Sequence, residues 1–543
     1  MPGRTVIQWD KHGVEGMSLF KVDLLGLGAL THLDYAFRLL ERHMGTPMDM
    51  ASIPMDVPAV YAMLQRGDTV GVFQLESRAQ MAMLPRLRPR EFYDLVVEIS
   101  IVRPGPITGG MVHPYLRRRR GEEPVEYPHP DLEPVLAKTL GVPLFQEQVM
   151  KLAMVAADYT PGEADQLRRD MAAWRHTGRI EQHQERIIER MVARGIAREF
   201  AERVFEQIRG FGEYGFPESH AASFSLIAYA TAWLRATYPV VFTCALLNAW
   251  PMGFYSPASI VADARRHKLP LRPVDVLLSD WECTLEEEEA EPAAAAGGGA
   301  CPPLALRMGG RFIKGLSAAD WERLVAARPL EVWTGTGSRG VRRFLRRAGV
   351  DSAVRVSLAR AGALRSFEPR RRAVVWETLD SGPPEENDPV LVGDDEEVPR
   401  FSPLSAVETV AWDYLTSIHS TAAHPLEPYR SWLKARAYPS AQEVRHSPHG
   451  QLLSVIGMVI CRQRPETAAG TVFMTLEDET GFVNLVIWRD RFEKLRSVVL
   501  TGSFLGVRGT VQRAEGVVHV IVETAWHAEL PASPVAGESR DFH

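Results

Sequence analysis

The stretch Phe211–Ser225 reads FGEYGFPESHAASFS and leads directly into the apolar run LIAYATAWLRATYP, residues Leu226–Pro239. Gly212 and Gly215 predict a turn that presents aromatic side chains, and a helix with a small first turn follows. A flat ligand such as a nucleobase can approach a loop of this kind closely and stack on it. The alternative is an ordinary helix entry whose aromatics fill the core. The stretch alone leaves both interpretations open.

Composition indicates a globular chain with several domains. Its 543 residues are 45% apolar and 24% charged, which provides sizeable cores and excludes a disordered chain. A net charge of −6 does not indicate nucleic-acid binding, so any such contact requires local basic patches such as Arg117–Arg120. The four cysteines show no paired metal spacing, which predicts reduced thiols in a cytosol. No apolar run reaches the roughly 20 residues of a membrane span.

Two low-complexity segments divide the chain. Leu285–Pro303 is acidic and then rich in alanine and glycine, and Ser381–Pro399 is acidic with proline and glycine. Neither can bury enough apolar surface to fold alone, so both are predicted to be linkers. A helix-rich block precedes the first, a short helical block lies between them, and a strand-rich block follows.

Local signals place several helices. Leu30–Met44 carries one apolar face and is predicted to end at Gly45. Thr160–Glu163 has the pattern of a capping box with Pro161 at the first helical position. The run LVVEISIV, Leu95–Val102, resembles a strand that the rigid turn Arg103–Pro106 interrupts.

The last block alternates apolar and polar residues in five short segments, which predicts a small five-stranded barrel. The segments are LLSVIGMVICRQ (Leu452–Gln463), TVFMTLED (Thr471–Asp478), FVNLVIW (Phe482–Trp488), SFLGVRGTVQR (Ser503–Arg513) and GVVHVIVETAW (Gly516–Trp526). Basic and aromatic residues of this block predict a surface for single-stranded nucleic acid, although some of the aromatics must fill the barrel core. They are Arg462, Arg464, Phe473, Phe482 and Trp488.

Two charged pairs are suited to phosphate chemistry. On the helix after Thr160, Asp165 lies three and four residues before Arg168 and Arg169. Paired guanidiniums are bidentate donors for a triphosphate, but they also occur on an ordinary solvated helix face. In a strand over Phe20–Leu24, Lys21 and Asp23 share one face, which suits a metal ion beside a polyphosphate or, alternatively, a surface ion pair.

Between the linkers, the turn Lys314–Ser317 leads into an amphipathic helix. Backbone amides at such a turn, including that of Gly315, can bind phosphate without reading sequence, and the element resembles a helix-hairpin-helix. Arginine residues follow it and add positive charge; the alternative is a plain helical connector. They are Arg342, Arg343, Arg346 and Arg347.

Six blocks in this order resemble the C-family bacterial DNA polymerases, the alpha subunits of DNA polymerase III. They are FKVDLLGLGALT (Phe20–Thr31), GVFQLESR (Gly71–Arg78), IVRPGPITGGMV (Ile101–Val112), LFQEQVM (Leu144–Met150), YTPGEADQLRRDM (Tyr159–Met171) and FGEYGFPESHAASFS. The residues Phe216–His220 resemble the error-prone branch, which acts in damage-induced mutagenesis. The resemblance covers nearly the whole chain and corresponds to the carboxy-terminal half of such an enzyme.

The resemblance implies a multidomain, mainly α-helical fold with a carboxy-terminal barrel. The implied domains are a palm remnant (residues 1–30), fingers (31–284), a linker (285–303), a helix-hairpin-helix region (304–380), a linker with connecting helices (381–450), an OB fold (451–530) and a tail (531–543). It also implies roles for individual residues. Asp23 is the catalytic carboxylate and a metal ligand, and the nucleotide-binding residues are Lys21, Arg168, Arg169, Tyr214, Ser219 and His220.

The sequence departs from the family at the catalytic carboxylates. Two-metal nucleotidyl transfer needs more than one of them, yet only 19 residues precede Phe20. Pro130–Glu133 has an acidic pattern, but it is predicted to be a helix start in another domain. We therefore expect a DNA polymerase by family whose chain alone is inactive; the alternative is a non-catalytic DNA-binding or assembly module, or half of a split polymerase.

The resemblance also implies ligands, partners and a location. It implies Mg²⁺ held with carboxylates of the missing palm region, primer–template DNA, and deoxynucleoside triphosphates. A sliding clamp reached through a partner protein, and other mutagenesis-complex subunits, are expected as partners in the cytoplasm. Ser539–His543 resembles the native terminus of the error-prone branch.

Overall fold

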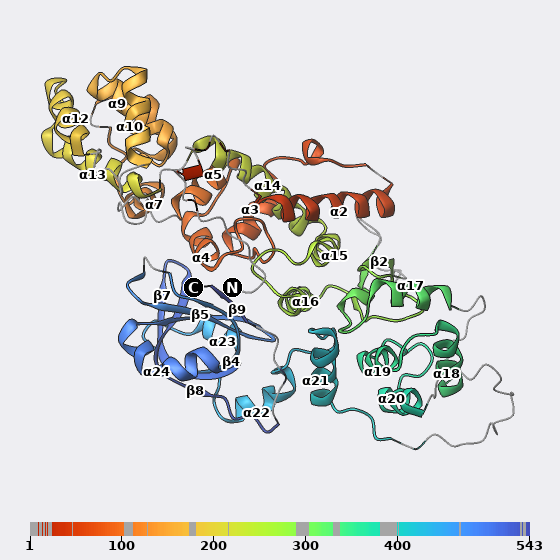
Figure 1. Ribbon diagram of the computed structural model, residues 1–543. Coiled ribbons are helices and arrows are strands. Elements are labelled where there is room, and N and C mark those ends of the chain that lie inside the picture. The colour runs from red at the N-terminus through yellow and green to blue at the C-terminus, as the bar shows by residue number, and fades with distance from the viewer. Residues whose placement is uncertain are drawn as a thin grey trace.

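The computed structural model describes most of the chain (Figure 1). The described residues are 9, 13–14, 17, 19, 24–45, 47–102, 112–127, 129–172, 181–214, 217–288, 303–328, 337–380, 399, 401–465, 468–532, 535 and 539–542. The helices before the first strand are α2 (Leu27–Met44), η1 (Met50–Ser52), α3 (Pro58–Gln65), α4 (Arg78–Leu87), α5 (Phe92–Ile101), α7 (Val112–Arg119), η2 (Pro130–Leu132), α8 (Glu133–Leu136), η3 (Ala137–Thr139), α9 (Gln146–Ala157), α10 (Pro161–Ala172), α12 (Glu181–Ala193), α13 (Arg198–Tyr214), α14 (Glu218–Thr237), α15 (Pro239–Ala249) and α16 (Pro257–Arg266).

A mixed region and a barrel follow. The mixed region comprises β1 (Leu271–Arg272), β2 (Thr284–Glu287), β3 (Leu304–Arg307), η4 (Gly310–Phe312), α17 (Ala318–Ala326), α18 (Gly337–Ala348), α19 (Ser352–Ala361), α20 (Arg371–Asp380), α21 (Ala406–Ser417), η5 (Glu427–Tyr429), α22 (Arg430–Ala435) and α23 (Ala441–His446). The barrel comprises β4 (Leu452–Gln463), β5 (Val472–Asp478), β6 (Gly481–Ile487), α24 (Arg489–Thr501), β7 (Phe504–Ala514), β8 (Val517–His527) and β9 (Arg540–Phe542).

Several helix boundaries follow from their sequence signals. Gly45 ends α2 in the left-handed conformation, with φ 67°, and its N–H donates to the Glu41 carbonyl. The capping box at α10 is confirmed, because the Thr160 N–H donates to the Glu163 carboxylate at 2.9 Å and the Glu163 N–H to the Thr160 hydroxyl at 3.3 Å. Pro130–Glu133 is confirmed as the start of a helical turn.

The strand expected over Leu95–Val102 is wrong, because residues 92–101 form α5. The Asp94 carboxylate caps the first turn by accepting from the Arg90 and Glu91 N–H groups at 2.7 and 3.3 Å, and all residues from Asp94 to Ile101 are buried. A helix that is buried on every side has no polar face, so its apolar run looks the same as that of a buried strand.

Two apolar cores organise the helices. The first surrounds α2, α14 and α15 and continues through the β1–β3 sheet to α17–α20. The second lies among α5, α7, α9, α10, α12 and α13, the group at the upper left of Figure 1. The Phe92 ring packs against both cores and joins them. The nucleotide-binding residues proposed on α10 and α14 therefore belong to connected helical layers.

Part of the predicted linker over residues 285–303 is a strand. Leu285–Glu287 belongs to β2, which pairs antiparallel with β3 and sets Leu285 opposite Leu306. Leu285 is buried in the first core, so the acidic segment begins inside the fold. β1 pairs with β3 in parallel and completes this three-stranded sheet.

The five predicted strands of the last block form a closed barrel. β4 pairs with both β5 and β7, and β6 pairs with β8, so the sheet closes in the order β4-β5-β6-β8-β7. Helix α24 links the third and fourth strands. The short strand β9 adds in parallel to the edge of β4. This is the topology of an OB fold, and the predicted architecture of the block is confirmed.

Candidate nucleotide and DNA contact surfaces

Arg168 and Arg169 lie on the outer face of α10 and share one carboxylate. The Arg168 Nη2 donates to Asp165 at 2.8 Å and the Arg169 Nε at 2.9 Å. The hydrogen bonds from these guanidiniums lower the pKa of Asp165. The Arg168 and Arg169 side chains remain 39% and 67% exposed, so an incoming anion can reach them.

The opposite face of α10 fixes the orientation of the helix. Ala164 and Leu167 are fully buried in the second core. Asp170 is held by the Gln166 amide at 2.9 Å and by the His183 ring at 3.1 Å. Because these contacts fill the inner face, the two arginines are directed outward.

The start of α14 is tied to α9 and α5. The Glu218 N–H donates to the Glu147 carboxylate at 3.0 Å, and the Tyr93 hydroxyl donates to the Glu218 carboxylate at 2.7 Å. A carboxylate at a helix N-terminus also interacts favourably with the helix dipole. Ser219 is exposed beside these contacts, and the half-buried His220 ring lies 4.1 Å from that of Phe224.

Other residues predicted for the site lie outside the described part. They include Lys21 and Asp23. Tyr214 ends α13, and its side chain also lies outside.

The predicted turn at Lys314–Ser317 is present. Gly315 adopts φ 78°, and Ser317 caps α17 through a capping box with Asp320. The Lys314 ammonium donates to the Tyr414 carbonyl at 3.4 Å, and the Lys314 N–H to the Thr416 carbonyl at 2.8 Å. These bonds tie the turn to α21, so the lysine also has a structural role that the sequence did not indicate.

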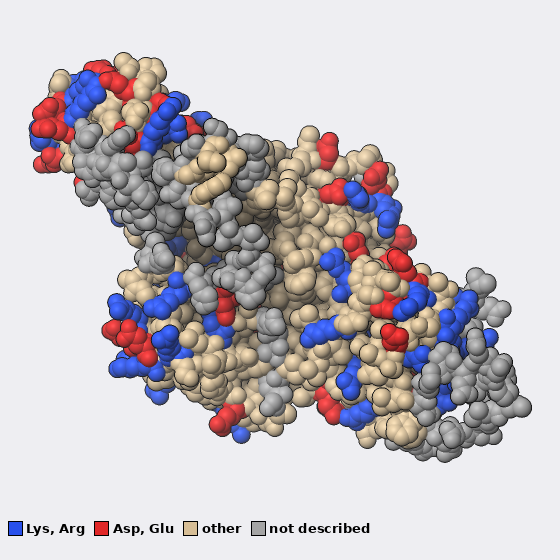
Figure 2. Space-filling view, viewed as in Figure 1, with Lys and Arg blue, Asp and Glu red and all other residues tan. Residues whose placement is uncertain are grey.

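The arginines of α18 have different environments. Arg342 is half-buried and ion-paired with the buried Glu377 of α20. Arg343 and Arg346 are exposed. Basic side chains gather at the right of the molecule, over the region of α18 (Figure 2).

The prediction that Arg462 belongs to a surface for single-stranded nucleic acid is wrong. Its side chain is 8% exposed and donates to the Val499 and Gly502 carbonyls at 2.7 and 2.5 Å. It also binds the Ser539 hydroxyl at 2.6 Å and pairs with Asp541 at 3.2 Å. The guanidinium thus fastens the end of α24 and the last residues to β4, and these acceptors leave no room for a phosphate.

Two aromatics of the same predicted surface are also covered. The Phe473 ring lies 5.1 Å from the Arg78 guanidinium, and the Phe482 ring stacks on Tyr255 at 6.2 Å, with Arg266 4.7 Å away. These partners come from α4, α16 and the segment before α16. By contrast, Trp488 and Arg464 are exposed, and the Arg464 guanidinium lies 5.0 Å from the Phe492 ring.

Arg78 fastens the helical region to the barrel. Its guanidinium donates to the Met474 carbonyl of β5 at 3.1 Å and to the Leu485 carbonyl of β6 at 2.8 Å. Burial lowers the pKa of Arg78 to about 10, so it remains charged at neutral pH. The sequence offered no local signal for this role, because its partners lie about 400 residues away.

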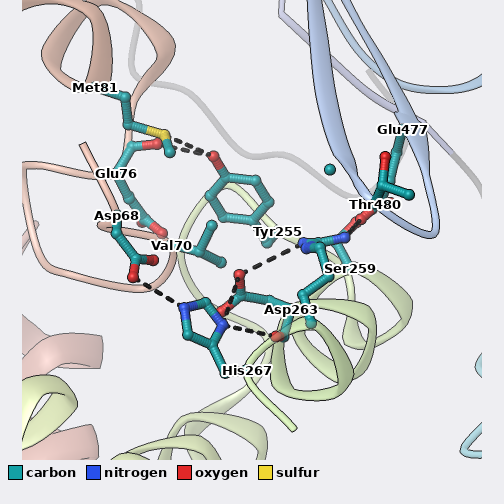
Figure 3. A network of polar contacts seen from close by, with 12 residues as sticks. Asp68, Val70, Glu76, Met81, Tyr255, Ser259, Asp263, His267, Glu477 and Thr480 are labelled. Atoms are coloured by element: carbon teal, nitrogen blue, oxygen red, sulfur yellow. Dashed lines mark hydrogen bonds and ion pairs between the residues drawn. The ribbon is translucent and has the colours of Figure 1, made fainter. Parts of the chain in front are cut away.

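A network of charged groups also lies between the helical region and the barrel (Figure 3). Arg235 of α14 lies 2.5 Å from Asp68 and 2.8 Å from Asp263, and Arg266 lies 2.8 Å from Glu477 of β5. Asp68, Asp263 and His267 are also the one group in the described residues with the spacing of metal ligands. Arg235 and Arg266 already neutralise these carboxylates, so the group does not fit Mg²⁺ and acts as an ion-pair cluster.

His267 is expected to make the stability of this cluster depend on pH. The hydrogen bond to Asp68, at 2.9 Å, raises the pKa of His267 above its ordinary value near 6.5. The stabilisation is therefore complete below about pH 6.5 and is lost as pH rises through the higher folded-state pKa. In urea titrations, the difference in unfolding free energy between the unmodified chain and His267→Gln should shrink as pH rises above about 6.5. A difference that stays constant or grows with pH would contradict this assignment.

Comparisons with known proteins agree with this architecture. Residues 29–195 match the bacterial DNA polymerase III alpha subunit finger domain, 268–374 a helix-hairpin-helix motif, and 453–526 an OB-fold nucleic acid binding domain. An error-prone DNA polymerase of Pseudomonas paraeruginosa is 49% identical over 100% of this chain and 52% of its own length. One of Pseudomonas fluorescens is 48% identical over 100% of this chain and 51% of its own. The chain belongs to the family of the error-prone DNA polymerases.

The family match has a defined extent. The chain spans about half the length of the curated relatives it matches. Among solved structures, asparaginyl-tRNA synthetase from Pyrococcus horikoshii matches 19% of the chain at 23% identity with a TM-score of 0.15, too low to indicate a common overall fold. In the described part of this polymerase-family chain, no helix has the length and apolar character needed to cross a bilayer.

Proposed function

We propose that this chain supplies the fingers, helix-hairpin-helix and barrel parts of an error-prone DNA polymerase that acts in the cytoplasm. The observation that carries the proposal is the match of the entire chain, at 49% identity, to an error-prone DNA polymerase. The reaction is the templated addition of a deoxynucleotide to a primer 3′ end, with tolerance of damaged templates. A sliding clamp reached through a partner protein, and other mutagenesis-complex subunits, complete the proposed assembly.

In this proposal, Arg168 and Arg169 bind the triphosphate of the incoming nucleotide. The geometry of the pair supports this role, because both guanidiniums are exposed, adjacent and oriented by a single carboxylate. Lys21 adds charge to the same phosphates, and Tyr214, Ser219 and His220 lie near the nascent base pair. The α18 arginines and the Lys314–Gly315 turn contact the DNA backbone.

Mg²⁺ is the proposed cofactor, with Asp23 as one of its ligands. When bound, the metal ions stabilise charge on the attacking and leaving oxygens. Such a site needs further carboxylates, and the one group in the described residues with the spacing of metal ligands is already neutralised by arginines. We therefore propose that the chain alone is inactive and requires carboxylates supplied by another polypeptide segment.

Primer extension tests this proposal. The chain alone should not extend a primer, whereas a full-length error-prone relative carrying this chain in place of its matching half should do so with Mg²⁺. Asp23→Asn in the full-length chimera should abolish extension, and a chelator should do the same. An inactive chimera beside an active parent would contradict the polymerase assignment. Extension by the isolated chain would contradict only its proposed dependence on another segment.

A further inference from the structure

The outer wall of the barrel carries a pocket of about 490 Å³ that none of the predicted sites includes. The loop after α22 and the strands β4 and β7 form it. Its lining includes Arg436, Tyr438, Leu452, Ser454 and Arg508. Ser454 and Arg508 face each other across the β4–β7 ladder. Pockets of this volume accommodate ligands of the size of a nucleotide.

The pocket is basic and partly aromatic. Arg508 is exposed, and no described residue forms an ion pair or side-chain hydrogen bond with it. The exposed Arg436 guanidinium lies 4.1 Å from the Trp432 ring. This contact holds the positive charge of Arg436 at the rim of the pocket. Among the described residues that line the pocket, none is acidic. Its charge is therefore complementary to phosphate, and Tyr438 offers an aromatic surface for a base.

The usual binding face of an OB fold is closed in this protein. OB folds bind oligonucleotides through their second and third strands, which here are β5 and β6. Arg78 occupies the Met474 and Leu485 carbonyls of these strands, while Tyr255 and Arg266 cover Phe482. A polynucleotide that contacts this barrel in the docked arrangement must use another surface.

We propose that this pocket binds single-stranded DNA. Arg436 and Arg508 contact consecutive phosphates, and one unpaired base stacks on Tyr438. A single strand fits better than a duplex because its unpaired bases are free to stack on the aromatic side chain of Tyr438, whereas paired bases are stacked within the helix. The proposal rests on the proposed function for its biological context, in which the strand is the unpaired template.

The test measures fluorescence anisotropy of the full chain with an oligothymidylate of about 12 nucleotides, a length within the site sizes of OB folds. Arg436→Ala plus Arg508→Ala should weaken binding at least about tenfold at low salt. It should also reduce the slope of log affinity against log salt by about 1.4, because each single-strand phosphate contact contributes about 0.7. Tyr438→Ala should weaken binding by about fivefold or more while leaving that slope unchanged, because stacking involves no counterion release.

Matched variants distinguish DNA binding at this pocket from general attraction of DNA to positive charge on the surface. Arg436→Lys plus Arg508→Lys should retain the salt slope, and Arg496→Ala on the exposed side of α24 should leave both affinity and slope nearly unchanged. Thermal melting confirms that each variant is folded. Unchanged binding in the double alanine variant, or an equal loss in Arg496→Ala, would overturn the proposal, as would failure of the unmodified chain to bind the oligonucleotide. Primer extension by the full-length chimera is scored separately, so an active chimera without this binding would reject the pocket alone.

Discussion

Arg235→Met is expected to lower the free energy of unfolding by about 3–5 kcal/mol, because it leaves buried carboxylates without their cation. Arg235 is 8% exposed and pairs with both Asp68 and Asp263. It also donates to the Asp68 and Val70 carbonyls, each at 3.1 Å. Methionine retains much of the packing of the arginine stem but none of these bonds. Urea titration followed by helical circular dichroism measures the effect.

An exposed arginine provides the control for this variant. Arg38 of α2 pairs with Asp34, and their side chains are 71% and 55% exposed. Arg38→Met should change the unfolding free energy by less than about 0.5 kcal/mol, as is typical of surface pairs. Asp68→Asn plus Asp263→Asn should recover part of the loss in the Arg235→Met background, because the uncompensated charges are then removed. Equal effects of Arg235→Met and Arg38→Met would show that burial of the cluster contributes little.

Arg168→Ala plus Arg169→Ala is expected to weaken nucleotide binding by about 100-fold in the full-length chimera. Each charge-assisted hydrogen bond to a triphosphate contributes about 1.5–3 kcal/mol, and the variant removes at least two. The dissociation constant for the incoming nucleotide, measured by single-turnover extension, gives the effect. Affinity for primer–template DNA should change much less.

A neighbouring arginine controls for this charge removal. Arg198 lies on α13, is 62% exposed and pairs with Glu202 along its own helix. Arg198→Ala should leave the nucleotide dissociation constant within about twofold, because a solvated helix pair contributes only a few tenths of a kcal/mol. If the Arg168 and Arg169 variant binds nucleotide normally, the pair is a solvated helix face and the triphosphate lies elsewhere.

Elements encoded by short-range patterns could be predicted from the sequence. The α10 capping box needs only residues Thr160–Glu163, and the left-handed end of α2 needs only Gly45. The barrel was predictable because alternation over each strand reports one buried face, and its five segments all form strands. The pairing of Asp165 with Arg168 and Arg169 was also predictable, because it follows from spacing along one helix.

Environment-dependent features could not be predicted in this way. The run Leu95–Val102 looked like a strand because complete burial of α5 removes its polar face. Leu285 was assigned to a linker because its neighbours are acidic. In the structure it lies in β2, which pairs with β3. In both cases the deciding contacts come from other parts of the chain, and composition within a short window does not report them.

The local pattern of the chain was enough to place the ends of α2 and α10 and the arginine pair on α10, because hydrogen bonds between residues a few positions apart decide these features. It also placed the strands of the barrel, because their alternation reports one buried face. Tertiary structure decided which arginines remain available to a ligand. Arg462 was predicted to be a surface cation, yet folding brings backbone carbonyls to its guanidinium, as it does to that of Arg78. Arg508, which no motif singled out, stays exposed in a basic pocket. A buried guanidinium must satisfy its donors within the fold, and only the arrangement of distant segments determines where that happens.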